Sequence, residues 1–180
     1  MVIGDVMKNT IISLFFCLLL GLVMSFYLFK QYDVPVSKEA ETLTFLQTAV
    51  YSDLDSLRRC GVSYALVGLE TMPSEPRGSI GMIKPTGWHT VKYDNVDGKY
   101  LYNRCHLIGY QLTGENANEK NLITCTRQMN IGPMLTYENK VADYVKKTNN
   151  HVLYRVTPIF EGNNLLASGA LMEGYSVEDH

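Results

Sequence analysis

The sequence predicts an α+β domain with a mostly antiparallel sheet, preceded by an N-terminal transmembrane helix. Three observations lead to this prediction. Residues 11–29 form a run of 19 residues without a charged side chain. Several short apolar or alternating segments are bounded by Gly, Pro and Asn, which is typical of strands. One longer segment, residues 133–147, has apolar residues at helical spacing. Strands with one prominent helix favour an antiparallel α+β fold over a regularly alternating parallel one.

The apolar run at residues 11–29 nearly reaches across a hydrocarbon core of about 30 Å, at about 1.5 Å per residue. A cleaved signal peptide has about 7–15 apolar residues and a small-x-small cleavage site, which is not found here. We therefore expect an uncleaved signal anchor, with cleavage and secretion as the alternative. Lys8 and Lys30 flank the run, so the positive-inside rule does not choose an orientation.

Three parts of the chain are expected: an anchor over residues 1–30, a stalk over 31–56 and a folded domain over 57–180. A helix is expected around residues 39–57, because apolar residues recur there at spacings of three and four. They are Leu43, Leu46, Val50, Leu54 and Leu57.

Strand and turn patterns follow through the rest of the chain. The expected strands cover residues 62–69, 88–93, 99–106, 121–126, 152–160 and 165–171, with a polar loop over 111–120. The expected helix at 133–147 begins with Pro133, whose missing N–H is tolerated at a first helical position. Lys146 and Lys147 lie in its last turn, where cations complement the helix dipole.

Composition narrows the function classes. The net charge is −2, but residues 58–155 hold 13 Lys and Arg against 8 Asp and Glu, which is compatible with a phosphate-binding face. Beyond the apolar run there are three cysteines, Cys60, Cys105 and Cys125, too few for a disulfide framework. We expect buried free thiols, with a single bridge of unassigned pairing as the alternative. Trp88 and the many tyrosines are expected in the core rather than stacked on bases.

Four side chains between residues 102 and 138 suit phosphodiester hydrolysis. His106 is a suitable general base because imidazole titrates near neutral pH. Arg104 lies two residues earlier on a predicted strand, hence on the same face, and can grip a phosphate. Asn130 and Glu138 offer the oxygen ligands that Mg²⁺ prefers, with waters completing its coordination. The Gly132-Pro133 pair interrupts the segment between them, so Asn130 is placed on the helix or in the turn that enters it.

The run Asn103-Arg104-Cys105-His106, with Asn130 and Glu138 following, resembles the DNA/RNA non-specific endonucleases that have a ββα-metal (His-Me finger) active site. The segment NRCHLIGYQLTGENANEKNLIT is similar to Gram-positive, streptococcal-like members of this family. The resemblance covers roughly residues 57–180. Two positions depart from the family's Asp-Arg-Gly-His motif: Asn103 replaces Asp and Cys105 replaces Gly.

The resemblance implies a role for each matched residue. His106 is expected as the general base, Asn130 as the direct Mg²⁺ ligand, and Glu138 as a holder of metal-bound waters. Arg104 is expected to position phosphate, and Asn121 to be a further active-site asparagine. Two more arginines match less closely. Arg77 is expected to contact phosphate, and Arg127 either contacts phosphate or forms a salt bridge.

Together these observations predict a sequence-nonspecific, Mg²⁺-dependent endonuclease (with Mn²⁺ as a second usable ion) that contacts the DNA or RNA backbone. The resemblance implies products with 5′-phosphate ends. We expect residues 11–29 to bind the membrane. The folded domain is then outside the cell, either anchored there or secreted. Two alternatives remain. One is a membrane-tethered nucleic-acid-binding protein without catalysis. The other is a zinc site built from Cys60, Cys105, His106 and Cys125, whose spacing is unlike that of known zinc sites.

Overall fold

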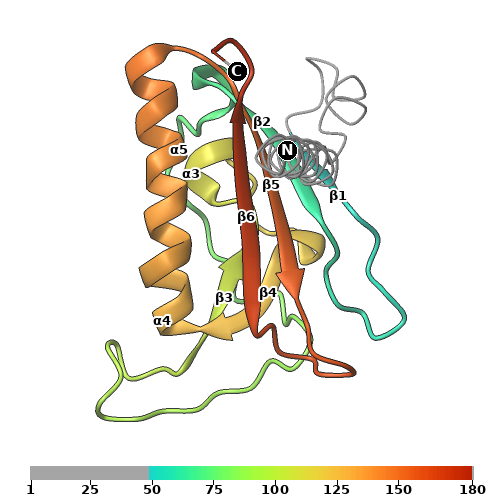
Figure 1. Cartoon of the computed structure of the whole chain (residues 1–180). Helices are drawn as coiled ribbons and strands as arrows, with labels where there is room; N and C mark the ends of the chain where they lie inside the picture. Colours follow the sequence, from blue (N-terminus) through green and yellow to red (C-terminus); the bar gives the residue numbers. More distant parts are fainter. Residues whose placement is uncertain (1–48, 180) are drawn as a thin grey trace, which may run out of the picture. The chain divides into compact units, whose positions relative to one another are not determined.

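Two antiparallel sheets and one long helix make up residues 49–179, the part of the chain that this computed structural model describes (Figure 1). The strands are β1 (Ala49–Tyr51), β2 (Ser63–Val67), β3 (Tyr102–His106), β4 (Leu122–Thr126), β5 (Val152–Ile159) and β6 (Gly169–Ser176). The helical elements are η1 (Leu69–Thr71), α3 (Tyr110–Thr113), η2 (Glu119–Asn121), α4 (Arg127–Met129), η3 (Asn130–Met134) and α5 (Leu135–Thr148). The prediction of an α+β fold with antiparallel sheets is therefore confirmed.

The larger sheet has the order β1-β2-β5-β6, with every neighbouring pair antiparallel. Strand β2 alternates buried and half-buried residues, as a strand with one face on the core should. Helix α5 runs alongside this sheet (Figure 1). Its buried residues Ala142 and Val145 join Val67 and Val156 of the sheet in one hydrophobic core. This packing holds α5 against the rest of the domain.

The smaller sheet pairs β3 with β4, from Tyr102 opposite Thr126 to His106 opposite Leu122. Chain elements α4, η3 and α5 follow β4 directly, so the predicted order of strand, loop, strand and helix is present. The helical region is continuous but changes geometry at η3, a π-type turn in which Gly132 has φ −91° and ψ −105°. The regular helix therefore begins at Leu135, two residues after Pro133, and it ends at Thr148.

Three expected elements differ from the structure. The helix over 39–57 is wrong for its described part, because β1 occupies residues 49–51 and pairs with β2. The strand over 88–93 is absent; that segment is loop with one isolated bridge between Lys92 and Tyr100. The last strand lies at Gly169–Ser176 rather than 165–171. At residues 49–51, pairing with β2 decides the structure, and the local helical pattern does not record that pairing.

The cysteine prediction was also wrong for two of the three residues. Cys105 and Cys125 form a disulfide, and Cys60 is a buried free thiol. In the β3–β4 register Cys105 lies opposite Ile123 and Cys125 opposite Asn103, so the bridge joins diagonal neighbours on one face of the pair. Loss of both thiolates excludes the zinc site considered from the sequence.

The predicted transmembrane segment lies outside the described residues. Within residues 49–179, no helix has the length and hydrophobicity required to span a bilayer. The apolar run at residues 11–29 therefore stays a prediction from sequence.

Candidate active site

His106 is the last residue of β3 and is 7% exposed. Its Nε2 lies 2.7 Å from the carbonyl oxygen of Asn116 and, because a carbonyl only accepts, Nε2 is the donor. The neutral ring then has its lone pair on Nδ1. Burial lowers the pKa of His106, against the opposing effect of the Asn116 carbonyl, and the positive charge of Arg77 lowers it further. The ring is thus held as a neutral base with Nδ1 as the acceptor.

Glu138, in the first turn of α5, is 9% exposed. Its carboxylate lies against Gly109, where an added β-carbon would meet both carboxylate oxygens. Burial raises the pKa of Glu138 to about 7, while a hydrogen bond from the Gln111 side chain and the charge of Arg77 lower it. An acidic side chain buried among so few donors is electrostatically unbalanced, and a cation would balance it.

Arg77 links these two groups. It lies in the exposed loop between η1 and β3, and its charge acts on both His106 and Glu138. The loop is attached to the ββα unit by two further contacts. The Tyr110 hydroxyl donates to the Glu75 carbonyl at 2.7 Å, and the Asn116 Nδ2 donates to the Ser79 carbonyl at 3.3 Å. Arg77 is therefore close enough to His106 and to Glu138 for its charge to act on both.

A groove of about 660 Å³ is lined in part by Arg77, whereas His106 and Glu138 are not among its lining residues. Arg77, Arg104, Arg127 and Asn130 line it, which is a concentration of cationic and amide groups suited to a phosphate backbone. Asn130 begins the π-type turn η3, and its side-chain amide makes no hydrogen bond to residues 49–179. Its oxygen is therefore available to a ligand at this position.

Arg104 is more constrained than the sequence suggested. Its Nε and Nη2 donate to the carbonyl oxygens of Ile83 and Gly81, and its guanidinium carbon lies 3.8 Å from the centroid of the Trp88 ring. These contacts hold the loop of residues 81–88 against β3. Arg104 thus shapes the groove wall as well as lining it.

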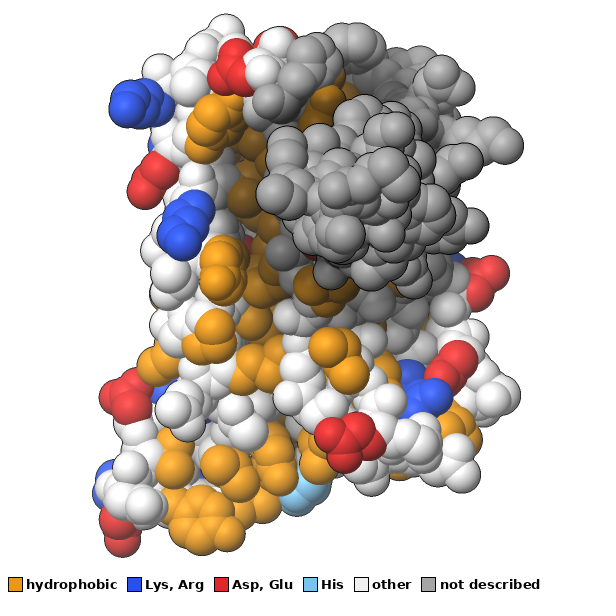
Figure 2. Space-filling view, in the orientation of Figure 1, with side chains coloured by type: hydrophobic (Ala, Val, Ile, Leu, Met, Phe, Trp, Pro, Cys, Tyr) orange, Lys and Arg blue, Asp and Glu red, His pale blue; other side chains and the backbone are white. Residues whose placement is uncertain are grey.

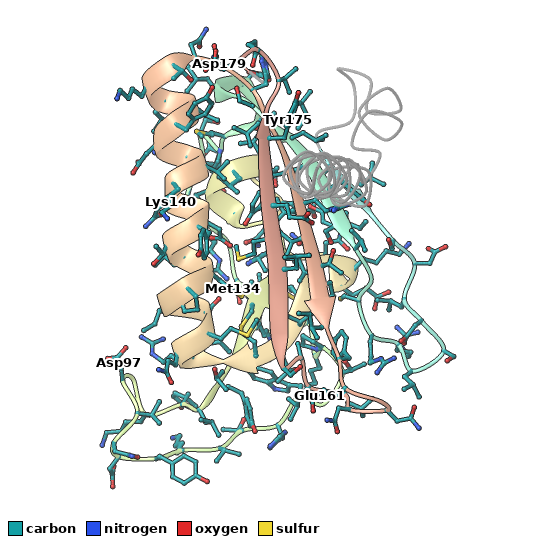
Figure 3. The ribbon with its side chains drawn as sticks, in the orientation of Figure 1. Asp97, Met134, Lys140, Glu161, Tyr175 and Asp179 are labelled. Atoms are coloured by element: carbon teal, nitrogen blue, oxygen red, sulfur yellow. A yellow bond between two sulfur atoms is a disulfide. The ribbon has the colours of Figure 1, made fainter. Side chains whose placement is uncertain are left out.

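Arg127 forms a salt bridge. Its Nε and Nη2 both donate to Asp97 Oδ2, at 2.9 and 2.7 Å. Asp97 lies at the far end of the loop between β2 and β3, close to α4 (Figure 3). Of the two roles left open from the sequence, ion pairing is the one present in the structure.

Asn121 does not reach the groove. It is completely buried, and its amide pairs with the backbone of Ile108, accepting from Ile108 N at 2.8 Å and donating to Ile108 O at 3.0 Å. A residue so placed fixes the chain that follows His106. Its contacts indicate a positioning role rather than the catalytic contact expected from the sequence.

Sequence reasoning missed three residues that build the site. Asn116 orients His106, Gly109 makes room for Glu138, and Gln111 is hydrogen-bonded near that carboxylate. The sequence did contain an indication for Gly109, because a glycine directly before a helical segment is typical of a place where another group approaches the backbone closely. Asn116 contacts His106 through its backbone carbonyl, so its side-chain type gave no indication of this contact.

The donor set suits a hard divalent cation. Among the described residues no group of three or more His, Cys, Asp and Glu is placed to hold a metal. Asn130 and Glu138 offer one amide oxygen and one carboxylate, which fits Mg²⁺, since this ion keeps most of its waters. The buried carboxylate with raised pKa is the structural observation that favours such an ion.

Known proteins resemble this chain in sequence and in fold. The model of the DNA/RNA non-specific endonuclease family matches residues 38–177. NucA from Streptococcus agalactiae, solved with magnesium bound, is 25% identical, with a TM-score of 0.64 over 71% of this chain and 63% of that chain. Sda1 nuclease, solved with bound zinc, is 26% identical, with a TM-score of 0.60 over 72% of this chain and 70% of that chain.

The chain thus spans slightly less than two thirds of the NucA structure. A sequence comparison with curated proteins gave no significant match. The family model covers well over half of the sequence, and the chain belongs to the DNA/RNA non-specific endonuclease family.

Proposed function

We propose that this protein is a metal-dependent endonuclease that hydrolyses phosphodiester bonds of DNA or RNA without reading sequence. The observation that carries the proposal is the neutral His106 ring, whose Nε2 donates to the Asn116 carbonyl and leaves Nδ1 as the acceptor. The charge of Arg77 acts on both His106 and Glu138. Family membership and the nuclease structures of similar fold support it.

The chain's own residues supply most of the reaction. His106 Nδ1 takes a proton from a water molecule, and the water oxygen attacks phosphorus in line with the 3′ leaving oxygen. Arg77 lies close enough to His106 to affect its pKa and is exposed, so it is placed to neutralise a phosphoryl oxygen. The backbone carbonyl of Asn116 holds the His106 ring in place and stabilises the imidazolium that forms. Products would carry 5′-phosphate ends.

Asn130 and Glu138 would hold the metal, Asn130 directly and Glu138 through bound waters. A bound divalent ion would stabilise charge on the phosphoryl and leaving oxygens. Mg²⁺ is the proposed ion and Mn²⁺ a substitute, because both take oxygen ligands. The NucA and Sda1 structures contain magnesium and zinc respectively, which supports a divalent ion at the corresponding place.

Lack of base readout follows from the lining of the groove. Its arginines and Asn130 suit phosphate oxygens, and contacts of that kind position a nucleic acid without reading its sequence.

We further propose that the domain works outside the cytoplasm, anchored through residues 11–29 or released after cleavage. The disulfide between Cys105 and Cys125 supports this, because such bonds persist in oxidising compartments. A protease added to intact cells should remove the domain if it faces outward, and protection of the domain would contradict the orientation.

The test of the activity uses the full chain in mild detergent with plasmid DNA and with RNA. We expect cutting with Mg²⁺, none with a chelator, and a loss of at least about 100-fold in His106→Ala. His151→Gln is the control, since His151 contacts Glu178 and Glu70 instead of the groove. Equal cutting by His106→Ala would reject His106 as the base. Tight binding without cutting by the unmodified chain would favour the non-catalytic receptor.

A further inference from the structure

The groove lined by Arg77 and Arg104 has an aromatic wall as well as a cationic one. Four rings line it: Trp88, His89, Tyr100 and Tyr102. They come from the long loop between β2 and β3 and from the start of β3. Exposed hydrophobic side chains gather over this loop at the lower end of the molecule (Figures 1 and 2). The sequence prediction that placed Trp88 and the tyrosines in the core is wrong for Tyr100, which is exposed.

The four rings differ in how much of their surface other side chains cover. Trp88 is covered on one face by Arg104. The rings of His89 and Tyr102 contact each other, with centroids 4.7 Å apart and planes tilted by 57°. Tyr100 is 47% exposed although Lys92 Nζ lies 4.7 Å from its ring centroid. Tyr100 therefore keeps much of its surface available to a ligand.

The aromatic wall of the groove is placed to contact a nucleic-acid strand that passes His106, the proposed base. Tyr102, Arg104 and His106 alternate along β3 and so share one face. Tyr102 and His106 are four positions apart, a distance of about 13 Å along a strand. A nucleic-acid strand with its scissile phosphate at His106 would carry neighbouring nucleotides over the wall.

Aromatic rings recognise bases by their flat faces, which are accessible only where a base is unpaired and unstacked. In a duplex those faces are covered by neighbouring base pairs, and exposing one costs a few kcal/mol. The groove, at about 660 Å³, has the size of pockets that hold small-molecule ligands, so it suits a nucleotide or two.

We propose that His89, Tyr100 and Tyr102 form a base-stacking subsite, and that single-stranded or locally unpaired nucleic acid is the preferred substrate of this site. The inference rests on the proposed nuclease function and names its substrate class. Lys92, over the Tyr100 ring, adds positive charge that favours a backbone phosphate next to the stacked base.

The test measures binding to the full chain in mild detergent with a chelator present, so that no cleavage occurs. The probes are a fluorescent DNA strand of about ten nucleotides, the same strand with abasic sites in place of bases, and its duplex. We expect the intact strand to bind more tightly than the abasic strand and the duplex. Tyr100→Ala should weaken binding of the intact strand by about 5- to 100-fold, the range for one stacked base, and leave the abasic strand nearly unchanged.

Two variants control for a general effect on the loop. Tyr100→Phe keeps the ring and should retain binding. Tyr93→Ala removes a tyrosine that is 52% exposed on the same loop but does not line the groove, and it should bind all probes normally.

The outcomes separate the subsite from the nuclease. Equal loss of intact and abasic strands in Tyr100→Ala, or no loss, would overturn the subsite, and Mg²⁺-dependent cutting would still support the nuclease. Base-dependent binding that requires Tyr100, in a chain that cuts nothing, would support the subsite and reject the nuclease. A chain that binds no nucleic acid would overturn both.

Discussion

The Glu138 carboxylate lies directly against Gly109, in the space that a β-carbon at position 109 would occupy. Gly109 comes three residues after His106 and precedes α3, whereas Glu138 lies in the first turn of α5. The absence of a side chain at one position therefore sets how closely the base-bearing segment and the acidic side chain approach each other.

Gly109→Ala tests this approach. Gly109 has φ −61° and ψ 143°, which any residue adopts, so the substitution adds a methyl group without backbone strain. We expect displacement of the Glu138 carboxylate, a stability loss of about 1–3 kcal/mol from overpacking, and a cleavage rate reduced at least about tenfold. Gly169→Ala is the control, because its β-carbon would make an ordinary 3.6 Å contact with Ile159. Normal cleavage by Gly109→Ala would show that the close approach has no catalytic role.

Glu138→Gln should stabilise the metal-free domain while reducing its activity. Burial raises the pKa of Glu138 to about 7 from 4.5, so the folded state holds a proton that the unfolded state loses between these values. Stability therefore falls as pH rises from 4.5 to 7 and stays lower above it. At pH 8 with a chelator, the variant should unfold with a free energy higher by up to about 3 kcal/mol, and the gain should vanish near pH 4.

Denaturant unfolding of both chains at the two pH values measures this difference. A pH-independent gain would mean that ionisation of Glu138 is not its cause. Cleavage with Mg²⁺ should fall in the variant, because an amide does not replace the negative charge. Such a trade of stability for function is common at active sites.

The pH profile of cleavage should have its acid limb below pH 6.5. His106 acts as a base only when neutral, and burial, then the Arg77 charge, lower its pKa from 6.5. At saturating Mg²⁺, a bound cation would keep the Glu138 carboxylate ionised through neutral pH. Then kcat/KM should stay level at neutral pH and fall about tenfold per pH unit below the lowered pKa of His106. Arg77→Gln removes a cation near His106 and should move the limb to higher pH, in addition to weakening substrate binding. A limb above pH 6.5 in the unmodified chain would be inconsistent with the assigned base.

Loss of the Cys105–Cys125 disulfide should destabilise the site. The bond closes a loop with a sequence separation of 20 that contains His106 and its partner Asn116. Replacing both cysteines by Ala should lower the free energy of unfolding by about 3 kcal/mol. The reductant response is the sharper measurement. A reducing agent with mild denaturant should lower the melting temperature of the unmodified chain and leave that of the double variant unchanged.

Cys60→Ser serves as the control, because Cys60 is a buried free thiol that donates to the Leu122 and Glu119 carbonyl oxygens. A hydroxyl can keep these hydrogen bonds, so this variant should still respond to reductant. If the unmodified chain and the double variant melt alike in reductant and in oxidant, the bridge contributes nothing to stability.

Local patterns predicted much of this domain. A short apolar run bounded by Gly and Pro located β2, and a predicted hairpin turn located β5. Apolar residues at helical spacing located α5. The motif around His106, with Asn130 and Glu138 after it, was enough to indicate the family, since few chemistries need these residue types in this order. The alternation along β3 also placed Arg104 and His106 on one face.

The sequence alone therefore determined the fold class and the family. Only the tertiary structure decided which residues pair with each other across the domain. Arg127 is paired with Asp97, 30 residues away, and Asn121 with Ile108, 13 residues away. The Cys105–Cys125 bond and the space for Glu138 above Gly109 likewise join separate segments. Such pairings depend on how strands and loops come together in three dimensions, and a pattern confined to neighbouring residues does not encode them.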